Sequence, residues 1–256
     1  MKLSSETFGS GQELVMLHGW GMNSAVWRDF AQRLAQSYRV TLIDLPGHGL
    51  SPYSGEQGLE SWAAACLEVA PERAVWMGWS LGSMVAMQAI LDAPARASGA
   101  LMVAGMPKFV KSEDWPYAME LRTLNQFIDL LGDDMSRALE RFLAIQMLGS
   151  DLSAEILRGL KARLKKLPDP DPEALQAGLD LLKQTDLRPR LAEIRCPMGW
   201  IYGGRDTLAP SRASKILPQW QRNSVIHTID KAAHTPFLSH PEEAQRLVLD
   251  SLEAMV

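Results

Sequence analysis

The sequence has little cysteine, no excess of positive charge and no long apolar run. Its 256 residues include two cysteines, Cys66 and Cys196, which lie far apart and lack the spacing of metal ligands. The sequence does not decide whether they form a disulfide, but a reducing compartment favours two buried free thiols. The formal net charge of −4 at pH 7 gives the chain as a whole no nucleic-acid signature.

Membrane and export signals are also missing. No stretch approaches the roughly 18 apolar residues that would predict a membrane span. Residues 1–8 lack the apolar region of a signal peptide, so we expect a cytoplasmic protein without a membrane partner. With 46% hydrophobic residues the chain can bury a large core, and an α/β fold of this length often forms one domain.

Apolar runs typical of buried strands alternate with runs of helical spacing. Residues 40–43 (Val-Thr-Leu-Ile) read as a strand, and residues 59–70 follow with a helical pattern. Such alternation predicts an α/β protein whose central sheet is mostly parallel and is covered by helices on both faces.

This alternation stops after residues 99–104, because about ninety residues pass before the next convincing strand begins at Met198. A crossover between parallel strands needs only about a dozen residues. The intervening residues read as several helices, separated by Gly132, Gly149 and the proline-rich residues 168–172. We predict a helical cap at residues 111–185, inserted into an α/β core of residues 1–110 and 186–256.

A serine lies in a glycine-containing turn between a predicted strand and a predicted helix. Residues 78–82 read Gly-Trp-Ser-Leu-Gly, with apolar residues before them and a helical run after them. This context is typical of a nucleophile elbow, whose tight turn holds Ser80 strained and clear of the backbone, where a base can reach its hydroxyl. A bare Gly-x-Ser-x-Gly match arises by chance in about one chain in ten, so the surrounding context decides. Trp79 is interpreted as a wall of the pocket rather than as core filler.

The acid and the base of a serine hydrolase follow further along the chain. Asp206 comes just after one predicted strand, and His234 lies in the loop after the next. The order Ser, Asp, His is that of α/β-hydrolases, so we predict a catalytic triad of Ser80, Asp206 and His234. Asp230 and Asp186 are the rival acids.

An acyl-transfer site also needs hydrogen-bond donors for the oxyanion. Residues 18–21 (His-Gly-Trp-Gly) follow an apolar strand and can turn sharply there. We assign the oxyanion hole to the backbone N–H groups of Trp20 and Leu81, the latter one residue after the nucleophile. His18 and His48 are interpreted as loop histidines with satisfied hydrogen bonds rather than as catalytic groups.

The predicted cap carries a local excess of positive charge. From residue 137 to residue 166 there are seven basic and three acidic residues, a net charge of +4. At helical spacing one face carries Leu139, Phe142, Leu143 and Gln146, and in the following helix one face carries Leu157, Leu160, Leu164 and Leu167. The opposite faces carry Arg137, Arg141, Arg158, Lys161 and Lys165. These faces are either solvated or a docking surface for an acidic partner.

Four segments together resemble the pimeloyl-[acyl-carrier protein] methyl ester esterase family of biotin synthesis, within the α/β-hydrolase superfamily. They are residues 18–23, 78–82, 141–146 and 231–234, and the similarity spans nearly the whole chain. The triad and oxyanion motifs are generic to α/β-hydrolases. The tryptophan before the nucleophile and the Phe-Leu-Ala-Ile-Gln segment of the cap are narrower signals.

The resemblance implies a set of substrate contacts and a docking surface. The substrate-binding residues that it implies are Trp20, Ser80, Leu81, Phe142, Leu143, Ala144, Ile145, Gln146 and His234. It also implies that the acidic acyl carrier protein binds the cap through Arg137, Arg141 and Arg158. A fourth family arginine falls at Ala154, which puts the strength of docking in question, and the glycine that usually follows the elbow is Ser83.

The residues and the resemblance together predict a serine carboxylesterase that removes methanol from the methyl ester of a pimeloyl chain on acyl carrier protein. We expect a monomer that needs no metal or organic cofactor, since the triad supplies both nucleophile and base. The main alternative is a general short-chain carboxylesterase without a carrier partner. Lyase or cofactor-free oxidoreductase chemistry on the same fold, and a ligand-binding module without turnover, are further alternatives.

Overall fold

The computed structural model describes residues 2–55, 57–150, 154–221 and 224–255. Their strands are β1 (Ser5–Gly9), β2 (Gln12–Leu17), β3 (Tyr38–Ile43), β4 (Ala74–Trp79), β5 (Ala97–Val103), β6 (Met198–Gly203) and β7 (Ser224–Ile229). Within the described residues, these strands form one seven-stranded sheet in the order β1-β3-β2-β4-β5-β6-β7. All neighbouring pairs are parallel except β1 with β3. The mostly parallel sheet of the prediction is confirmed.

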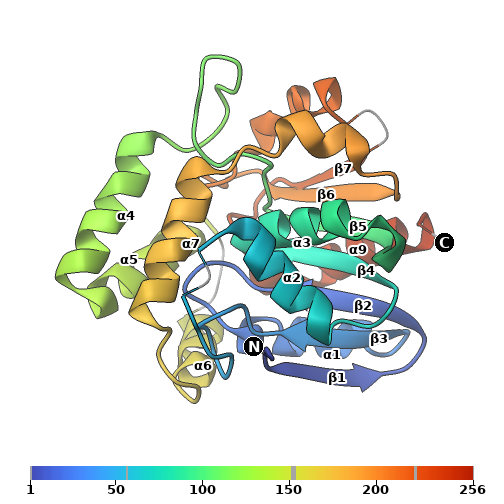
Figure 1. Ribbon diagram of the computed structural model, residues 1–256, viewed down its shortest axis with the longest axis horizontal. Coiled ribbons are helices and arrows are strands. Elements are labelled where there is room, and N and C mark those ends of the chain that lie inside the picture. Colours follow the sequence, from blue (N-terminus) through green and yellow to red (C-terminus); the bar gives the residue numbers. More distant parts are fainter. Residues whose placement is uncertain (1, 56, 151–153, 222–223, 256) are drawn as a thin grey trace.

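Helices cover both faces of this sheet (Figure 1). Helices α2 (Leu59–Val69) and α3 (Leu81–Asp92) pack together on one face, and α1 (Arg28–Leu34) and α9 (Pro241–Glu253) pack together on the other. The short helix α8 (Pro236–Ser239) precedes α9. Single 3₁₀ segments lie at Ser24–Val26, Pro94–Arg96, Arg188–Glu193, Ser211–Lys215 and Leu217–Gln219. Because both faces are covered, central strands such as β4 and β6 are buried along their whole length and read as continuous apolar runs.

Strand β1 at the edge of the sheet has no counterpart in the sequence analysis. Its residues are mostly polar and exposed, so they carry no hydrophobic signal. The strand forms because it pairs antiparallel with β3, with Ser5 opposite Ile43 and Gly9 opposite Arg39. Long-range pairing of this kind cannot be read from local residue preferences.

Among the described residues, four α-helices separate β5 from β6: α4 (Leu121–Asp133), α5 (Met135–Met147), α6 (Ala154–Leu164) and α7 (Pro172–Gln184). Figure 1 places them beyond the carboxyl ends of the parallel strands. We refer to residues 111–185 as the cap segment; its status as a separate domain stays a prediction. Gly132 lies in the last turn of α4 rather than between helices, whereas Asp171 caps α7 by accepting hydrogen bonds from the amides of Glu173 and Ala174. None of the described helices is both long enough and apolar enough to cross a membrane.

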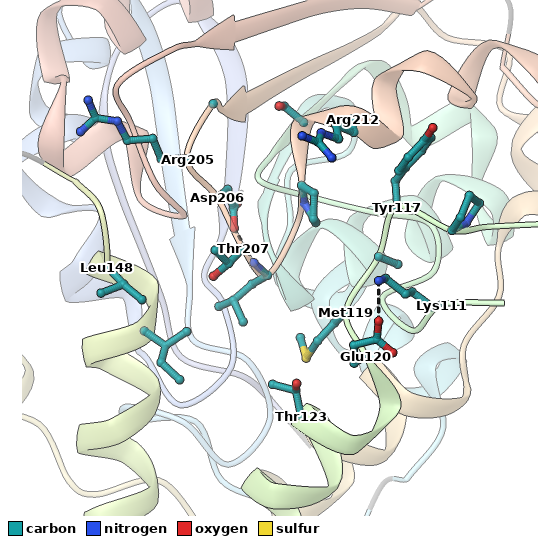
Figure 2. A pocket seen from close by; sticks show the side chains of 17 residues that line it. Lys111, Tyr117, Met119, Glu120, Thr123, Leu148, Arg205, Asp206, Thr207 and Arg212 are labelled. Carbon is teal, nitrogen blue, oxygen red and sulfur yellow. Dashed lines mark hydrogen bonds and ion pairs between the residues drawn. The ribbon is translucent and has the colours of Figure 1, made fainter.

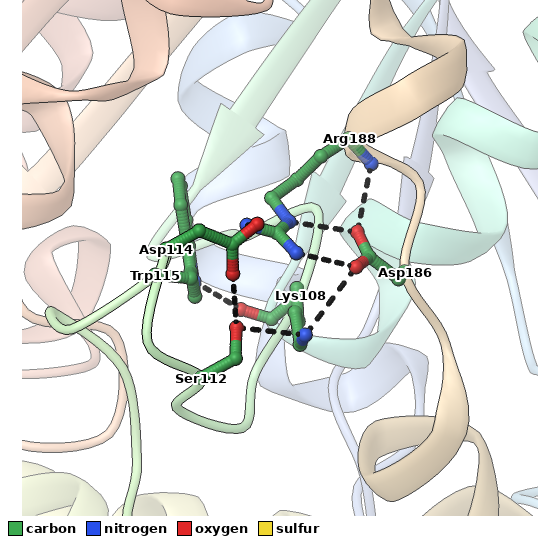
Figure 3. Close-up of polar contacts among 6 residues, drawn as sticks. All are labelled: Lys108, Ser112, Asp114, Trp115, Asp186 and Arg188. Atoms are coloured by element: carbon green, nitrogen blue, oxygen red, sulfur yellow. Dashed lines mark hydrogen bonds and ion pairs between the residues drawn. The ribbon is translucent and has the colours of Figure 1, made fainter.

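The chain enters and leaves the cap segment at one polar cluster (Figure 3). The Arg188 guanidinium, 5% exposed, forms a bidentate ion pair with Asp186 at 2.8 and 2.6 Å and a further ion pair with Asp114 at 3.0 Å. It also packs against the rings of Trp115 and Trp220, 5.4 and 5.1 Å from their centroids, and these two rings contact each other edge-on. Burial alone would raise the pKa of Asp186, but hydrogen bonds from Arg188 hold it below its ordinary value.

A backbone hydrogen bond from Leu187 to Pro107 and an ion pair of Lys108 with Asp186 join the same two connections. We call Lys108, Ser112, Asp114, Trp115, Asp186 and Arg188 the Arg188 cluster. Because its members precede α4 and follow α7, the cluster fixes where the cap segment begins and ends relative to the sheet.

Candidate active site

Ser80 occupies a strained turn between β4 and α3. Its backbone dihedrals are φ 54° and ψ −120°, in a region that residues with a side chain rarely adopt. The turn is held by its neighbours: the Ser80 amide donates to the Val103 carbonyl at 3.1 Å, and the Ser83 amide and hydroxyl both donate to the Ser80 carbonyl. Ser83, which stands where the resemblance implies a glycine, therefore contributes a hydrogen bond to the turn.

The flanking glycines are needed because the chain passes close to itself here. A Cβ atom on Gly82 would lie 2.5 Å from the carbonyl oxygens of both Leu17 and His18, and one on Gly78 would overlap the backbone of Gly82. Backbone atoms cannot move aside as a flexible side chain can. The two glycines thus let β4, α3 and the end of β2 approach one another around Ser80.

The structure brings the three triad candidates together from three separate loops. His234 Nε2 lies 2.9 Å from Ser80 Oγ, and His234 Nδ1 lies 2.7 Å from Asp206 Oδ2. All three side chains are buried. The rival acids lie elsewhere, since Asp230 is exposed and Asp186 belongs to the Arg188 cluster.

The hydrogen bonds around Asp206 define the tautomer of His234. Asp206 Oδ1 accepts hydrogen bonds from the amides of Leu208 at 2.8 Å and Ala209 at 2.9 Å, which orient the carboxylate and leave Oδ2 facing the imidazole. A carboxylate only accepts, so Nδ1 of His234 carries the proton. Nε2 is then free to accept the proton of the Ser80 hydroxyl, as a general base must.

Two backbone amides beside Ser80 lack acceptors. Leu81 begins α3, where the first amides of a helix have no partner within the helix, and Trp20 lies in the turn after β2. Both residues are buried, and in the described part of the chain no acceptor binds either amide. Gly19 lies against the nucleophile, because a Cβ atom there would be 3.2 Å from Ser80 Cβ. The two amides thus occur where the sequence analysis placed the oxyanion hole.

Trp79 has a role that the sequence did not indicate. It is fully buried, and its indole Nε1 donates a 2.8 Å hydrogen bond to the His234 carbonyl. Its ring packs edge-on against Phe237, 5.3 Å between centroids. The residue therefore holds the histidine loop in place from within the core, which differs from the pocket wall that the sequence analysis expected. Tryptophan next to a nucleophile fits either role, so only the fold distinguishes them.

Helix α5 of the cap segment covers the site. The Gln146 carbonyl accepts a 3.2 Å hydrogen bond from the His234 amide, and the Phe142 ring packs edge-on against Trp20, 4.7 Å between centroids. Of the four residues predicted to share one face, Phe142, Leu143 and Gln146 are buried and Leu139 is half-buried, whereas Ala144 is exposed. Both polar atoms of the Gln146 side chain are buried without a partner among the described residues. An unsatisfied buried polar group costs about 1–3 kcal/mol, so this amide is suited to a ligand.

A cavity of about 770 Å³ is lined in part by Asp206, the candidate acid (Figure 2). It lies between the loop after β6, the start of α4 and the end of α5, which contribute Asp206, Thr123 and Ile145 respectively. Lys111 and Glu120 form an ion pair at its edge. In the described part of the chain its lining includes neither Ser80 nor His234.

Both cysteines are free thiols away from the site. Cys66 is buried on α2, and burial raises the pKa of its thiol. Burial also raises the pKa of Cys196 to about 11. The choice that the sequence left open between a disulfide and free thiols is thus decided in favour of free thiols, which stay protonated at neutral pH.

Comparison with known proteins identifies the family. A profile of the alpha/beta hydrolase family matches residues 14–245. The pimeloyl-[acyl-carrier protein] methyl ester esterase of Methylococcus capsulatus is 43% identical over 248 residues, which are 97% of each chain. The protein of the same name from Pectobacterium carotovorum is 40% identical over 250 residues, which are 97% of this chain and 98% of that protein. The chain belongs to this esterase family.

Membership in the pimeloyl-[acyl-carrier protein] methyl ester esterase family confirms the resemblance found in the four sequence segments. Solved structures confirm the α/β-hydrolase fold. An esterase from Exiguobacterium antarcticum superposes with a TM-score of 0.89 at 20% identity, covering 98% of this chain and 95% of that one. A bromoperoxidase from Bacillus anthracis superposes with a TM-score of 0.86 at 21% identity over the same shares.

The arginines that the family resemblance singled out lie on the outside of the cap segment. Arg137 and Arg141 on α5 and Arg158 on α6 are exposed, and in the described ranges none of them forms an ion pair. Arg141 instead lies 6.0 Å from the centroid of the Phe127 ring. Ala154, where the resemblance implies a fourth arginine, is also exposed. These side chains are available to an acidic partner.

Proposed function

We propose that this chain hydrolyses the methyl ester of a pimeloyl chain carried on acyl carrier protein, releasing methanol and the free acid. The main support is the continuous hydrogen-bonded series from Ser80 Oγ through His234 to Asp206, with distances of 2.9 and 2.7 Å. A buried series of this kind, with two unpaired amides beside the serine, is suited to acyl transfer from an ester. The substrate comes from the family to which the chain belongs.

The first half of the reaction forms an ester between enzyme and substrate. Ser80 Oγ attacks the carbonyl carbon of the methyl ester while its proton passes to His234 Nε2, and the carbonyl π electrons move to the oxygen. The Trp20 and Leu81 amides stabilise this oxyanion, and each such donor lowers the barrier by about 3 kcal/mol in comparable sites. As the intermediate collapses, the C–OCH₃ bond breaks and His234 gives its proton to the departing methoxy oxygen.

The second half repeats the chemistry with water. His234 Nε2 takes a proton from water, whose oxygen attacks the carbonyl carbon of the Ser80 ester. Collapse of the second oxyanion breaks the bond to Ser80 Oγ, which regains a proton from His234. The product carries a free carboxylic acid at the end of the pimeloyl chain that is distant from the carrier protein. Asp206 stays ionised throughout and stabilises the imidazolium that forms twice in each cycle.

The cap segment supplies the proposed recognition. Phe142 and Leu143 give the underside of α5 an apolar surface for the methylene chain, and the unsatisfied Gln146 amide is placed to bind a polar group of the substrate. On the outer side, Arg137, Arg141 and Arg158 form the proposed docking surface for the acidic carrier protein. Exposed charge pairs contribute little affinity each but accelerate and orient the encounter.

The experiment that tests this proposal compares two esters with the purified chain. We expect kcat/KM for the carrier-bound pimeloyl methyl ester to exceed that for p-nitrophenyl acetate, with methanol and carrier-bound acid as products seen by mass spectrometry. Equal or better turnover of the small ester, with slow turnover of the carrier-bound one, would contradict the proposal and favour a general short-chain carboxylesterase. Ser80→Ala serves as the matched inactive control for both substrates.

A further inference from the structure

A fully buried histidine lies behind the loop that bears the Trp20 amide. His18 Nε2 is 3.0 Å from the Leu45 amide nitrogen, and His18 Nδ1 is 2.8 Å from the Gly19 carbonyl oxygen. The Leu45 amide can only donate, so Nε2 accepts and the ring proton resides on Nδ1. The imidazole is neutral and donates that proton to the Gly19 carbonyl. Burial lowers the pKa of His18, although Asp44 and the Gly19 carbonyl act in the opposite direction.

Two hydrogen bonds set the direction of the peptide that bears the Trp20 amide. The Gly19 carbonyl accepts from His18 Nδ1 at 2.8 Å and, over a longer distance, from the Met22 amide at 3.3 Å. The Gly19 carbonyl and the Trp20 N–H belong to one planar peptide unit, in which C=O and N–H point in opposite directions. Fixing the oxygen on the His18 side therefore points the N–H away from the ring. A Cβ atom on Gly19 would lie 3.2 Å from Ser80 Cβ, so this peptide is adjacent to the nucleophile.

We propose that His18 is a positioning residue, which aims the Trp20 amide at the oxyanion without touching the substrate itself. This inference rests on the proposed esterase function and on the assignment of Trp20 as an oxyanion donor. A preorganised donor stabilises the oxyanion without reorganisation when the charge develops. Without the imidazole, only the longer hydrogen bond from the Met22 amide restrains the Gly19 carbonyl, and the peptide can tilt out of that alignment.

The acceptor side of His18 is itself held rigidly. Leu45 follows Asp44, whose carboxylate accepts hydrogen bonds from the Ser24 amide at 2.7 Å and the Leu50 amide at 3.1 Å. The Ser51 hydroxyl donates to the Asp44 carbonyl at 2.6 Å. The turn after β3 thus provides a fixed point from which the imidazole reaches the oxyanion loop.

The other side of the loop is held by the cap segment. The Trp20 indole donates a 2.8 Å hydrogen bond to the Leu175 carbonyl of α7, and a Cβ atom on Gly178 of the same helix would lie 2.7 Å from the Trp20 ring. Helix α7 therefore fixes the Trp20 side chain, but a side chain can be fixed while its backbone amide rotates. His18 contacts the peptide itself, which is why the inference falls on this residue.

His48 offers a matched control. It is also fully buried, its ring centroid lies 5.3 Å from that of His18, and its Nδ1 is bonded to the Pro46 carbonyl at 2.9 Å. Burial, with His18 as a second cause, lowers the pKa of His48 to about 3, so it too is neutral. In the described residues no hydrogen bond joins it to residues 19–21. Removing His48 therefore reports the cost of losing a buried imidazole without disturbing the oxyanion loop.

The test uses the full chain, p-nitrophenyl acetate and a trifluoromethyl ketone, whose adduct with a serine carries an oxyanion. We expect His18→Leu to lower kcat by about 10- to 100-fold, somewhat less than outright loss of a donor, with KM within about twofold. Inhibition by the trifluoromethyl ketone should weaken by the same factor. His48→Leu should lower the melting temperature by a similar amount while leaving kcat and ketone affinity within about twofold.

Two conservative variants keep the test decisive if His18→Leu does not fold. His18→Asn retains a side-chain N–H for the Gly19 carbonyl, and His18→Gln carries an acceptor far enough out for the Leu45 amide. The proposal predicts a higher kcat for His18→Asn than for His18→Gln. It is overturned if kcat of His18→Gln equals or exceeds that of His18→Asn. It is also overturned if the His18 and His48 variants lose kcat equally. A wild-type chain that cleaves p-nitrophenyl acetate but not the carrier-bound ester refutes the proposed substrate alone. A chain that cleaves neither overturns both proposals.

Discussion

Replacing Asp206 with asparagine changes the histidine tautomer without removing any side chain from the triad. The Leu208 and Ala209 amides both donate to Oδ1 of Asp206. In Asp206→Asn these two donors select the carboxamide oxygen for that position, because an NH₂ group there would face two other donors. The NH₂ group must then face His234 and donate to Nδ1. The ring proton is forced onto Nε2, which faces Ser80.

An imidazole that carries its proton on Nε2 cannot accept the proton of Ser80. The variant also loses the negative charge that stabilises the imidazolium in both transition states. In a serine protease triad the corresponding change lowers kcat about 10⁴-fold, and the same geometry here predicts a loss of that order. Converted at 1.36 kcal/mol per factor of ten, this loss is about 5 kcal/mol of transition-state stabilisation. KM for a small ester should change little, since Asp206 does not touch the substrate.

The assay is steady-state hydrolysis of p-nitrophenyl acetate at pH 8, with the melting temperature as a check on folding. Asp230→Asn is the control, because Asp230 is an exposed rival acid in the loop before His234. We expect Asp230→Asn to keep kcat within about twofold of wild type. If Asp206→Asn retained more than about a tenth of wild-type kcat, or if the two results were reversed, the tautomer argument and the assignment of the acid would both be refuted.

Further substitutions test the outer surface of the cap segment and its connection to the sheet. Charge reversal to glutamate at Arg137, Arg141 and Arg158 should raise KM for the carrier-bound ester about tenfold and leave KM for p-nitrophenyl acetate unchanged. Raising the salt concentration from about 0.05 to 0.5 M should also raise KM for the carrier-bound ester alone, because the Debye length shrinks to roughly 4 Å. Equal losses for both esters would indicate a damaged cap, and no loss would favour solvated helix faces. Arg188→Ala should lower the free energy of unfolding by about 2–3 kcal/mol in urea denaturation. Arg190, whose half-buried side chain pairs with Glu193, is the control, and Arg190→Ala should lower it by less than about 1 kcal/mol. Equal losses would contradict the role of the Arg188 cluster.

Local sequence patterns predicted the parallel part of the fold because they report burial. Strands covered on both faces are continuous apolar runs, and β4 and β6 stand out for that reason. The elbow was predicted because its backbone segments approach so closely that only glycine fits at positions 78 and 82, and this requirement is visible in the sequence as Gly78 and Gly82. Strand β1 has no comparable sequence signal, since its formation depends on pairing with distant residues.

The order of Ser80, Asp206 and His234 along the chain suggested a triad, but order alone cannot show that three loops meet. The structure places them in contact and excludes Asp230 from that position. Long-range contacts outside the triad were not predicted. The bond from Trp79 to the His234 carbonyl spans 155 residues. No local periodicity encodes a pairing of that kind, so its partners emerge only once the strands are assembled.

The interpretation of His18 shows how a correct local inference can be incomplete. The sequence analysis expected a loop histidine with its hydrogen bonds satisfied, and the structure agrees. What the sequence could not supply is the identity of the partners. One of them is the peptide that bears the proposed oxyanion donor, which turns a satisfied histidine into a candidate positioning residue.

Turnover of the carrier-bound pimeloyl methyl ester by wild type and by Ser80→Ala is the most direct test of the central claim. Methanol release is followed under identical conditions, with circular dichroism to verify that both proteins are folded. The account predicts a fall in kcat of about 10⁵- to 10⁶-fold, with only oxyanion donors and binding left to act. If a folded Ser80→Ala variant kept a tenth or more of wild-type methanol release, the claim that Ser80 is the nucleophile would be wrong.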